Sequence, residues 1–227
     1  MALNCPGSAG TEYVASGPAA SINNIAAGTY ILWFKPSSLP GLRRLVVKLN
    51  GRIMALNDSS GFIRGFVNRS VTSTNYITNN NAITSGAWNC VAMTWDLGAA
   101  AGELVNIYRG TLTVALTECT YGTVTDGSGT AGDDSAAPLT IAGDGTNTGC
   151  PGDYAVYMVC NTVLTLGQLR AWQFSPRRMT TAVDFKHLGF NGTGTQPDWS
   201  GTGNPGTVTS MTVAPHVPLC NFFGRST

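Results

Sequence analysis

The segment from Trp88 to Asp96 constrains the fold most, because its apolar residues fall on odd and even positions alike. Successive side chains of a strand point to opposite faces of the sheet, so such a segment has to be covered on both faces. The run from Thr29 to Lys35 is β-branched and aromatic and is closed by Pro36, which indicates a strand buried on at least one face. We therefore expect strands packed in layers.

Composition and length favour one all-β domain. The 227 residues include 28 glycines and 11 prolines, which supply frequent turns, whereas the helix formers Glu and Lys are scarce. A chain of this length buries roughly 70% of its unfolded surface, and β-sandwiches commonly fill it as a single unit.

Turn signals divide the rest of the chain into further elements. Asn50-Gly51 predicts a tight hairpin between a strand over 42–49 and its return over 52–56. We expect a second hairpin to turn at Arg109-Gly110, between strands over 104–108 and 112–116. Strands are also expected over 62–67, 138–143 and 154–160, whereas the polar stretches 68–81 and 121–135 indicate irregular segments, the second an exposed and mobile loop.

Two short helices are expected near the C-terminal end. Thr165 and Gln168 have the spacing of a capping box, in which each side chain satisfies a free backbone donor of the other residue. A second short helix is predicted over 179–188, stopped at Gly189. Beyond it the chain consists mostly of turn formers and prolines.

Low charge argues against nucleic acid or membrane surfaces as partners. Only 11% of the residues are charged and the formal net charge is +1, so no long-range field attracts phosphate backbones or anionic lipid. The first residues lack the basic and apolar regions of a signal peptide, and no stretch is long and apolar enough to span a bilayer. We expect a protein made in a cytoplasm and not secreted through a signal peptide.

Six cysteines leave the disulfide state open, although we favour free thiols. The number is even, but the chain is long and no secretion signal is seen. No Cys-x-x-Cys pair occurs and neither histidine lies near a cysteine in sequence, which argues against structural zinc. Cys90 and Cys160 lie in apolar runs and are expected in the core.

Five motifs in order resemble the laminin-G-like branch of the concanavalin A-like superfamily. They are Trp33-Phe34-Lys35-Pro36, Gly86-Ala87-Trp88-Asn89-Cys90-Val91-Ala92, Ile107-Tyr108-Arg109-Gly110, Pro138-Leu139-Thr140-Ile141-Ala142-Gly143 and Val163-Leu164-Thr165-Leu166-Gly167-Gln168-Leu169. The resemblance implies an all-β, two-sheet antiparallel jelly-roll sandwich with one or two short helices and an irregular C-terminal arm. The expected organisation is an N-terminal arm over 1–20, the jelly roll over 21–175, and a C-terminal extension over 176–227 that packs on the sandwich or on a neighbour.

The C-terminal region carries a further resemblance. The run from Asp198 to Thr209 looks like a Gly- and Asn-rich signature usually found near the start of such domains, and its position here is similar to that in laminin-G-like proteins encoded by tailed bacteriophages. This resemblance implies a virion protein. No calcium site of the family maps onto this chain residue by residue.

The acidic residues argue against a glycosidase. Most glycosidases need two carboxylates flanking the scissile bond, about 5–5.5 Å apart in retaining enzymes. None of Glu12, Glu103 and Glu118 has another carboxylate two or three positions away, and the pair Asp133-Asp134 is interpreted as a solvated turn. Asp184 and His187 have helical i, i+3 spacing, which we interpret as a surface pair. We therefore expect no catalytic residues and no enzyme.

Binding residues are the remaining candidates. Asp144, Asn147 and Asp153 are weak calcium candidates, because oxygen donors on loops at a jelly-roll rim can hold this ion; no other cofactor is expected. Tyr76, Tyr121 and Tyr154 lie in or beside polar segments and are candidates for contact with a glycan or a protein. Trp33, Trp88, Trp95 and Trp172 are expected in the core.

Two functions remain from different classes. The first is a capsid decoration or cement protein, homo-oligomeric, whose partners are the major capsid protein or other virion subunits and whose arms over 2–21 and 191–227 lie across neighbours. The alternative is a carbohydrate-binding adhesion module, associated with a tail or a cell surface. A glycoside hydrolase is a distant third.

Overall fold

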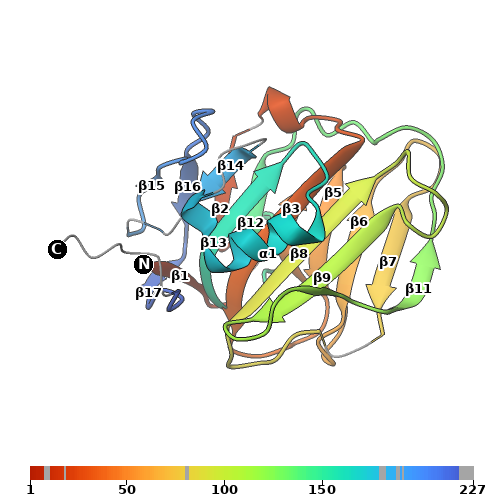
Figure 1. Ribbon diagram of the computed structural model, residues 1–227. Coiled ribbons are helices and arrows are strands. Elements are labelled where there is room, and N and C mark those ends of the chain that lie inside the picture. The colour runs from red at the N-terminus through yellow and green to blue at the C-terminus, as the bar shows by residue number, and fades with distance from the viewer. Residues whose placement is uncertain are drawn as a thin grey trace.

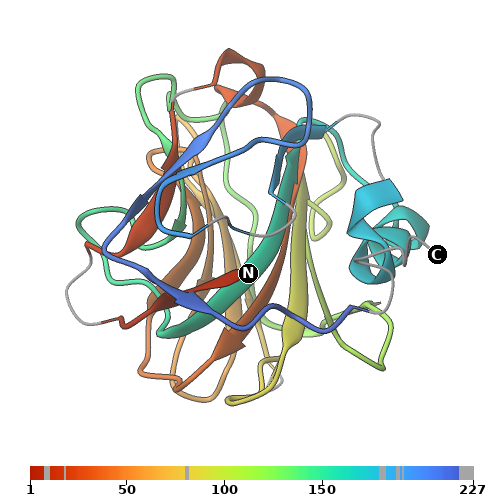
Figure 2. The ribbon, with the colours of Figure 1, turned by 90° about the vertical axis from the view of Figure 1, so that its left-hand side faces the viewer.

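Two antiparallel sheets packed face to face form the protein (Figure 1). The computed structural model describes residues 1–7, 11–17, 19–79, 82–178, 183–187, 190 and 192–219. Figure 2 shows the layers edge-on, with the helix α1 (Leu166–Phe174) outside one sheet. The expected all-β jelly roll of two sheets is confirmed.

We call the sheet next to α1 sheet A. In spatial order it contains β10 (Thr117–Glu118), β9 (Val105–Thr111), β8 (Asn89–Asp96), β3 (Ala27–Pro36), β13 (Gly152–Cys160), β1 (Ala2–Cys5) and β17 (Thr212–Ala214), with β14 (Val183–His187) paired to β13. The other, sheet B, contains β11 (Tyr121–Thr125), β7 (Thr74–Thr78), β6 (Ile63–Val67), β5 (Arg52–Leu56), β4 (Arg43–Lys48), β12 (Leu139–Ala142), β2 (Tyr13–Ser16), β16 (Gly206–Thr209) and β15 (Thr195–Gln196). Short 3-10 turns lie at η1 (Ala20–Ile22) and η2 (Pro176–Arg178).

Sheet A is buried on both faces, as the apolar runs predict. One face packs against sheet B, where the rings of Tyr30 and Trp95 meet edge to face with their centroids 4.9 Å apart. The other face packs under α1, where Trp33 and the buried Trp172 of the helix belong to one apolar cluster. Trp33 also donates a hydrogen bond from Nε1 to the Gln173 carbonyl, 3.1 Å away. Large aromatic side chains are buried on both faces, which explains why neither the odd-numbered nor the even-numbered side chains of β3 and β8 form a polar set.

The expected first hairpin and first helix are confirmed. Asn50 has φ of 62° in the turn between β4 and β5, a backbone conformation that Asn and Gly tolerate best. Thr165 caps α1: its hydroxyl accepts from the Gln168 amide, and the Gln168 side chain accepts from the Thr165 amide at 2.8 Å. These two local signals identify their elements because both depend on neighbours in sequence alone.

Three expected element assignments are wrong. The second hairpin does not turn at Arg109-Gly110, because β9 continues to Thr111 and the chain turns over 112–116. The polar stretches 68–81 and 121–135 hold β7 and β11, which pair with each other at the edge of sheet B. The second helix is absent from the part of 179–188 that the structure describes, where residues 183–187 form β14; residues 179–182 and 188 lie outside the described residues.

The terminal segments form strands of the sandwich, in contrast to the irregular arms expected over 2–21 and 191–227. β1 pairs with β13 and β17, and β2 pairs with β12 and β16, so strands from both ends of the chain lie side by side in both sheets. In Figure 2 the blue C-terminal strands run beside the red N-terminal ones across the end of the sandwich. Backbone pairing between distant segments leaves no signal in local composition, which explains the difference.

The described cysteines are free and buried: Cys5, Cys90, Cys119, Cys150 and Cys160. Cys220 lies outside the described residues.

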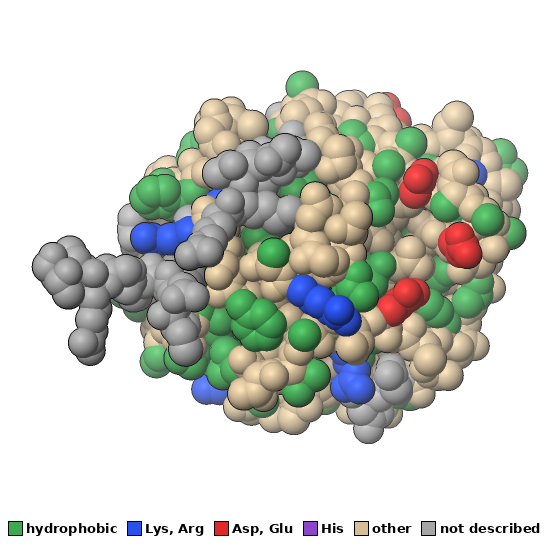
Figure 3. Space-filling view, in the orientation of Figure 1, with side chains coloured by type: hydrophobic (Ala, Val, Ile, Leu, Met, Phe, Trp, Pro, Cys, Tyr) green, Lys and Arg blue, Asp and Glu red, His purple; other side chains and the backbone are tan. Residues whose placement is uncertain are grey.

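In the described part of the chain, no helix is long and apolar enough to cross a membrane. On the face that Figure 3 draws, charged side chains are scattered among polar and apolar ones and form no continuous patch of one sign.

Candidate functional site

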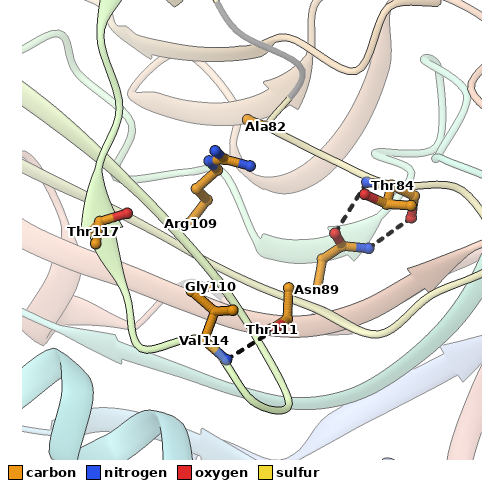
Figure 4. Close-up of a pocket in the computed structure, with 8 residues that line it drawn as sticks. All are labelled: Ala82, Thr84, Asn89, Arg109, Gly110, Thr111, Val114 and Thr117. Atoms are coloured by element: carbon orange, nitrogen blue, oxygen red, sulfur yellow. Dashed lines mark hydrogen bonds between the residues drawn. The ribbon is translucent and has the colours of Figure 1, made fainter.

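A pocket of about 210 Å³ opens beside β8 and β9, at the end of sheet A that is farthest from the terminal strands (Figure 4). Its eight lining residues come from the connection before β8, from β8 and β9, from the turn after β9, and from β10. They are Ala82, Thr84, Asn89, Arg109, Gly110, Thr111, Val114 and Thr117.

One wall is the connection between β7 and β8, which Asn89 fixes. The Asn89 side chain accepts from the Thr84 amide at 3.1 Å and donates to the Thr84 carbonyl at 2.9 Å (Figure 4). It also donates to the Ala87 carbonyl at 2.7 Å. An amide side chain that satisfies backbone groups in both directions holds a loop as a strand neighbour would, so Thr84 has a fixed position at the rim.

The opposite wall is the turn between β9 and β10, which Gln173 of α1 fixes. The fully buried Gln173 amide donates to the carbonyls of Thr111 and Val114, at 2.7 and 2.8 Å, and accepts from the Leu116 amide at 2.8 Å. The Thr111 hydroxyl accepts from the Val114 amide at 3.0 Å (Figure 4). The helix under sheet A therefore shapes the pocket without lining it.

The pocket offers hydroxyl and guanidinium groups beside small apolar surfaces. The hydroxyls of Thr84 and Thr117 and the guanidinium of Arg109 come from different elements, and Ala82 and Val114 add apolar surface. Such a lining can hydrogen-bond a polyhydroxylated ligand while its methyl groups contact C–H faces. None of the eight lining residues is Asp, Glu, His or Cys, so the lining holds no carboxylate pair.

The three candidate tyrosines are not surface residues of the kind we expected. Tyr76 and Tyr154 are 0% exposed, and Tyr121 packs against the core between the sheets. Each hydroxyl has a structural partner: Tyr154 donates to the Cys150 carbonyl at 2.9 Å, Tyr121 accepts from the Ile107 amide at 2.8 Å, and Tyr76 bonds Asp126. The correction follows from the strands β7, β11 and β13, which turn these rings inward.

The calcium candidates do not share one site. Asp144 and Asn147 are hydrogen-bonded to each other at 2.8 Å, whereas Asp153 lies on β13 and accepts from the Asn4 side chain at 2.8 Å. Asp144 faces the Arg44 guanidinium, with Oδ2 3.7 Å from Nε. Within the described residues, no three His, Cys, Asp or Glu side chains gather in a group that could hold a metal ion.

Two further interpretations change. Asp134 is not solvated: its side chain is 0% exposed, 2.8 Å from the Arg52 guanidinium and 3.9 Å from the Lys48 ammonium. Asp133 is exposed, as expected for a turn. Asp184 and His187 belong to the strand β14, so the helical spacing on which their pairing was based does not apply.

The pocket residues were missed as a site, although two of the family-like motifs contain them. Asn89 belongs to the motif over 86–92, and Arg109-Gly110 closes the motif over 107–110. These runs signalled strands, and only their pairing as β8 and β9 puts them beside each other. An exposed aromatic residue was missed too: Trp199, 56% exposed, follows Asp198 in a turn-rich segment. Of the tryptophans expected in the core, Trp33, Trp95 and Trp172 are buried and Trp88 is partly exposed.

The two antiparallel sheets form a jelly roll, an architecture that occurs in lectin domains and in viral capsid domains. The chain belongs to the family described as the concanavalin A-like lectin/glucanases superfamily, whose sequence pattern matches residues 8–170. No curated protein sequence matches the chain.

Solved structures share the fold at low sequence identity. A "putative carbohydrate binding protein" from Bacteroides ovatus is 15% identical with a TM-score of 0.64; the alignment covers 95% of this chain and 61% of that one. The chain thus spans about three fifths of that protein's length. Domains LG4-5 of the mouse laminin alpha1 chain are 16% identical with a TM-score of 0.48, covering 86% and 50%. The CBM40 of a Ruminococcus gnavus sialidase, bound to sialyllactose, is 14% identical with a TM-score of 0.43, covering 65% and 82%.

Proposed function

We propose that this protein is a non-enzymatic carbohydrate-binding module, and that the pocket beside β8 and β9 is its saccharide site. The observation that carries the proposal is the lining of this pocket, in which Thr84, Arg109 and Thr117 present hydrogen-bonding groups from three elements. The superfamily to which the chain belongs includes lectins as well as glucanases, which supports saccharide as the ligand class.

Binding without cleavage is supported by the chemistry of the same lining. Hydrolysis of a glycosidic bond uses an acid and a base or nucleophile, usually two carboxylates. The lining residues include no carboxylate. Threonine hydroxyls and an arginine hydrogen-bond a sugar but supply no proton donor matched to neutral pH.

The test begins with a glycan array and continues with calorimetric titration of the saccharides that bind. Arg109→Gln and Thr117→Val each remove hydrogen-bonding groups from the pocket, and we expect each to weaken binding at least fivefold. Thr123→Val is the matched control, because Thr123 is an exposed threonine of β11 outside the lining. Equal affinities of the variants and the control, or cleavage of a bound saccharide, would refute the proposal.

We further propose that the module is attached to a virion surface. The segment from Asp198 to Thr209, which resembles a segment of laminin-G-like proteins encoded by tailed bacteriophages, supports this. It assigns the chain a role as a capsid decoration or tail-associated protein with capsid or tail subunits as partners. Mass spectrometry of purified virions from an infected host tests it: the chain is expected among the virion proteins, and its presence only in the cell lysate would count against it.

A further inference from the structure

The outer face of sheet B, opposite its contact with sheet A, carries a buried apolar cluster of its own. Val47 and Ala55 are 0% exposed and Ile53 is 9% exposed, with Phe66 packed against them, and this cluster is separate from the core between the sheets. An outer sheet face normally presents polar side chains to water. Here long side chains cover the apolar residues instead.

Two of those side chains are arginines that flank Ala55 in one cross-strand row. Arg44 of β4 pairs with Ala55 of β5, and Ala55 pairs with Arg64 of β6, so all three project from the same face. Neighbouring strands lie about 4.8 Å apart, which puts the two arginine backbones roughly 10 Å from each other. Because Ala55 is small, the space above it is open to both long side chains.

Arg64 is fixed in place by an amide and an aromatic ring. Its Nε donates to Asn75 Oδ1 at 2.6 Å, and its Cζ lies 5.0 Å from the centroid of the Phe66 ring. Among the described residues, no Asp or Glu carboxylate lies within ion-pair distance of Arg64. Burial, followed by the charge of Arg44, lowers its pKa from the ordinary value. A half-buried cation without a carboxylate is costly, so its orientation calls for an explanation.

Arg44 is fixed by the loop that the sequence indicated as a weak calcium site. Its Nε lies 3.7 Å from Asp144 Oδ2, and the Asp144 side chain is 2% exposed. The Thr146 amide and the Asn147 side chain donate to this carboxylate at 3.0 and 2.8 Å. Thr146 and Asn147 thus hold the Asp144 carboxylate in place, and Asp144 positions Arg44.

The outward ends of both guanidinium groups remain available. Within the described residues, the Nη atoms of Arg44 and Arg64 make no hydrogen bond, and none of them is among the buried polar atoms that lack a partner. These atoms therefore keep some contact with solvent, while each Nε is held by a neighbour; the Arg44 side chain is 16% exposed. Oriented forks of this kind match the two oxygens of a carboxylate.

We propose that Arg44 and Arg64 form a second ligand site, on the outer face of sheet B, that binds the carboxylate of an acidic saccharide above Ala55. The inference of a carboxylate ligand depends on the two arginines alone. The inference that this carboxylate belongs to a saccharide depends on the proposed function. The formal net charge of only +1 gives the protein little general attraction for anions, so binding depends on this local pair.

Calorimetric titration of the full chain with tetragalacturonate, its fully methyl-esterified form and a sulfated tetrasaccharide tests the site. We expect tetragalacturonate to bind at least tenfold more tightly than the ester, and to lose this advantage in Arg64→Gln and in Arg44→Gln. Lys35→Gln is the matched control: it also removes one positive charge, from a side chain on sheet A that is 41% exposed. Raising the salt concentration should weaken tetragalacturonate binding, since charge pairs are screened.

Amide NMR spectra of the wild type locate the ligand independently of any variant's stability. Shifts at Ala55, Phe66 and Asn75 that appear with tetragalacturonate and not with the ester support the site. Equal binding of acid and ester, unchanged binding in both arginine variants, or preference for the sulfated probe overturns it. The proposed function is tested separately. Binding of neutral saccharides through Arg109 and Thr117 supports the pocket beside β8 and β9, whatever the result with tetragalacturonate.

Discussion

The Asp134 carboxylate connects parts of the chain that are far apart in sequence. It accepts from the Asn24 amide at 2.8 Å and faces the Arg52 guanidinium at 2.8 Å, and Lys48 donates to the Asp134 carbonyl at 3.0 Å. Arg52 in turn donates to the Ile22 carbonyl at 2.6 Å. These contacts hold together the loop over 130–137, the hairpin of β4 and β5, and η1.

Asp134→Asn is expected to destabilise the protein by about 3–5 kcal/mol, because it leaves two buried cations without a carboxylate. Urea unfolding followed by circular dichroism measures the change. Asp133→Asn is the neighbouring control; this side chain is exposed and bonds to Ser135 and to the Asn24 side chain, so little change is expected. Similar unfolding midpoints for the two variants would contradict the buried cluster.

The buried thiols give the protein an alkaline limit. Burial raises the pKa of Cys5 and of Cys119 to about 11 and that of Cys150 to about 12, and raises the pKa of Cys90 well above its usual value. Because the folded pKa is the higher one, stability is complete below the unfolded thiol pKa near 9 and is lost as the pH rises from 9 towards 11–12.

We therefore expect the urea midpoint to fall between pH 8.5 and pH 10.5, and the described cysteines to resist a thiol reagent at pH 8 until urea is added. Buried tyrosines such as Tyr154, whose pKa burial also raises, act in the same direction. Lys48 and Lys186, whose pKa burial lowers, oppose it in part. Fast labelling of the native protein would show that these thiols are accessible.

At the level of elements, α1 matters for the pocket more than its length implies. Gln173→Met removes the three bonds that hold the turn between β9 and β10. The Thr111 carbonyl and the Leu116 amide lose their Gln173 partner, whereas the Val114 carbonyl keeps its bond from the Thr111 amide. We expect a loss of about 2–4 kcal/mol in unfolding free energy and weaker saccharide binding.

Gly167→Ala is the comparison on the same helix. A Cβ at Gly167 meets only the Thr165 hydroxyl, at 3.9 Å, so the change should stabilise the protein by about 0.5–1 kcal/mol and leave binding intact. Equal binding by both variants would show that Gln173 does not shape the pocket.

The range of the interactions explains which features the sequence predicted and which it missed. The hairpin at Asn50 and the cap at Thr165 were predicted, because a positive φ and a cap depend on adjacent residues. The doubly covered β8 was predicted because both of its parities are apolar. The burial of Asp134 and the assembly of Asn89 with Arg109 were not, because they depend on strand pairing and loop packing between distant segments.

At the scale of the whole molecule, the candidate site and the terminal strands lie at opposite edges of the sandwich. The pocket lies at the edge formed by β8, β9 and β10, and the terminal strands β1, β16 and β17 lie at the other edge (Figure 1). Met211 joins the core between the sheets, and Val217 and Leu219 join the cluster on the outer face of sheet A. The C-terminal segment thus contributes to both apolar clusters.

Deletion of residues 206–227 is expected to lower the thermal midpoint by ten degrees or more, since it removes β16 and β17 and uncovers β1 and β2. Differential scanning calorimetry measures the change. An unchanged midpoint would mean that the sandwich is complete without these strands.

The most direct test of the central claim is an amide NMR titration of the wild-type protein with a neutral saccharide selected on a glycan array. The proposed binding site predicts shifts centred on Thr84, Arg109 and Thr117, with the saccharide recovered intact. Shifts confined to the terminal edge of the sandwich, or cleavage of the saccharide, would contradict it.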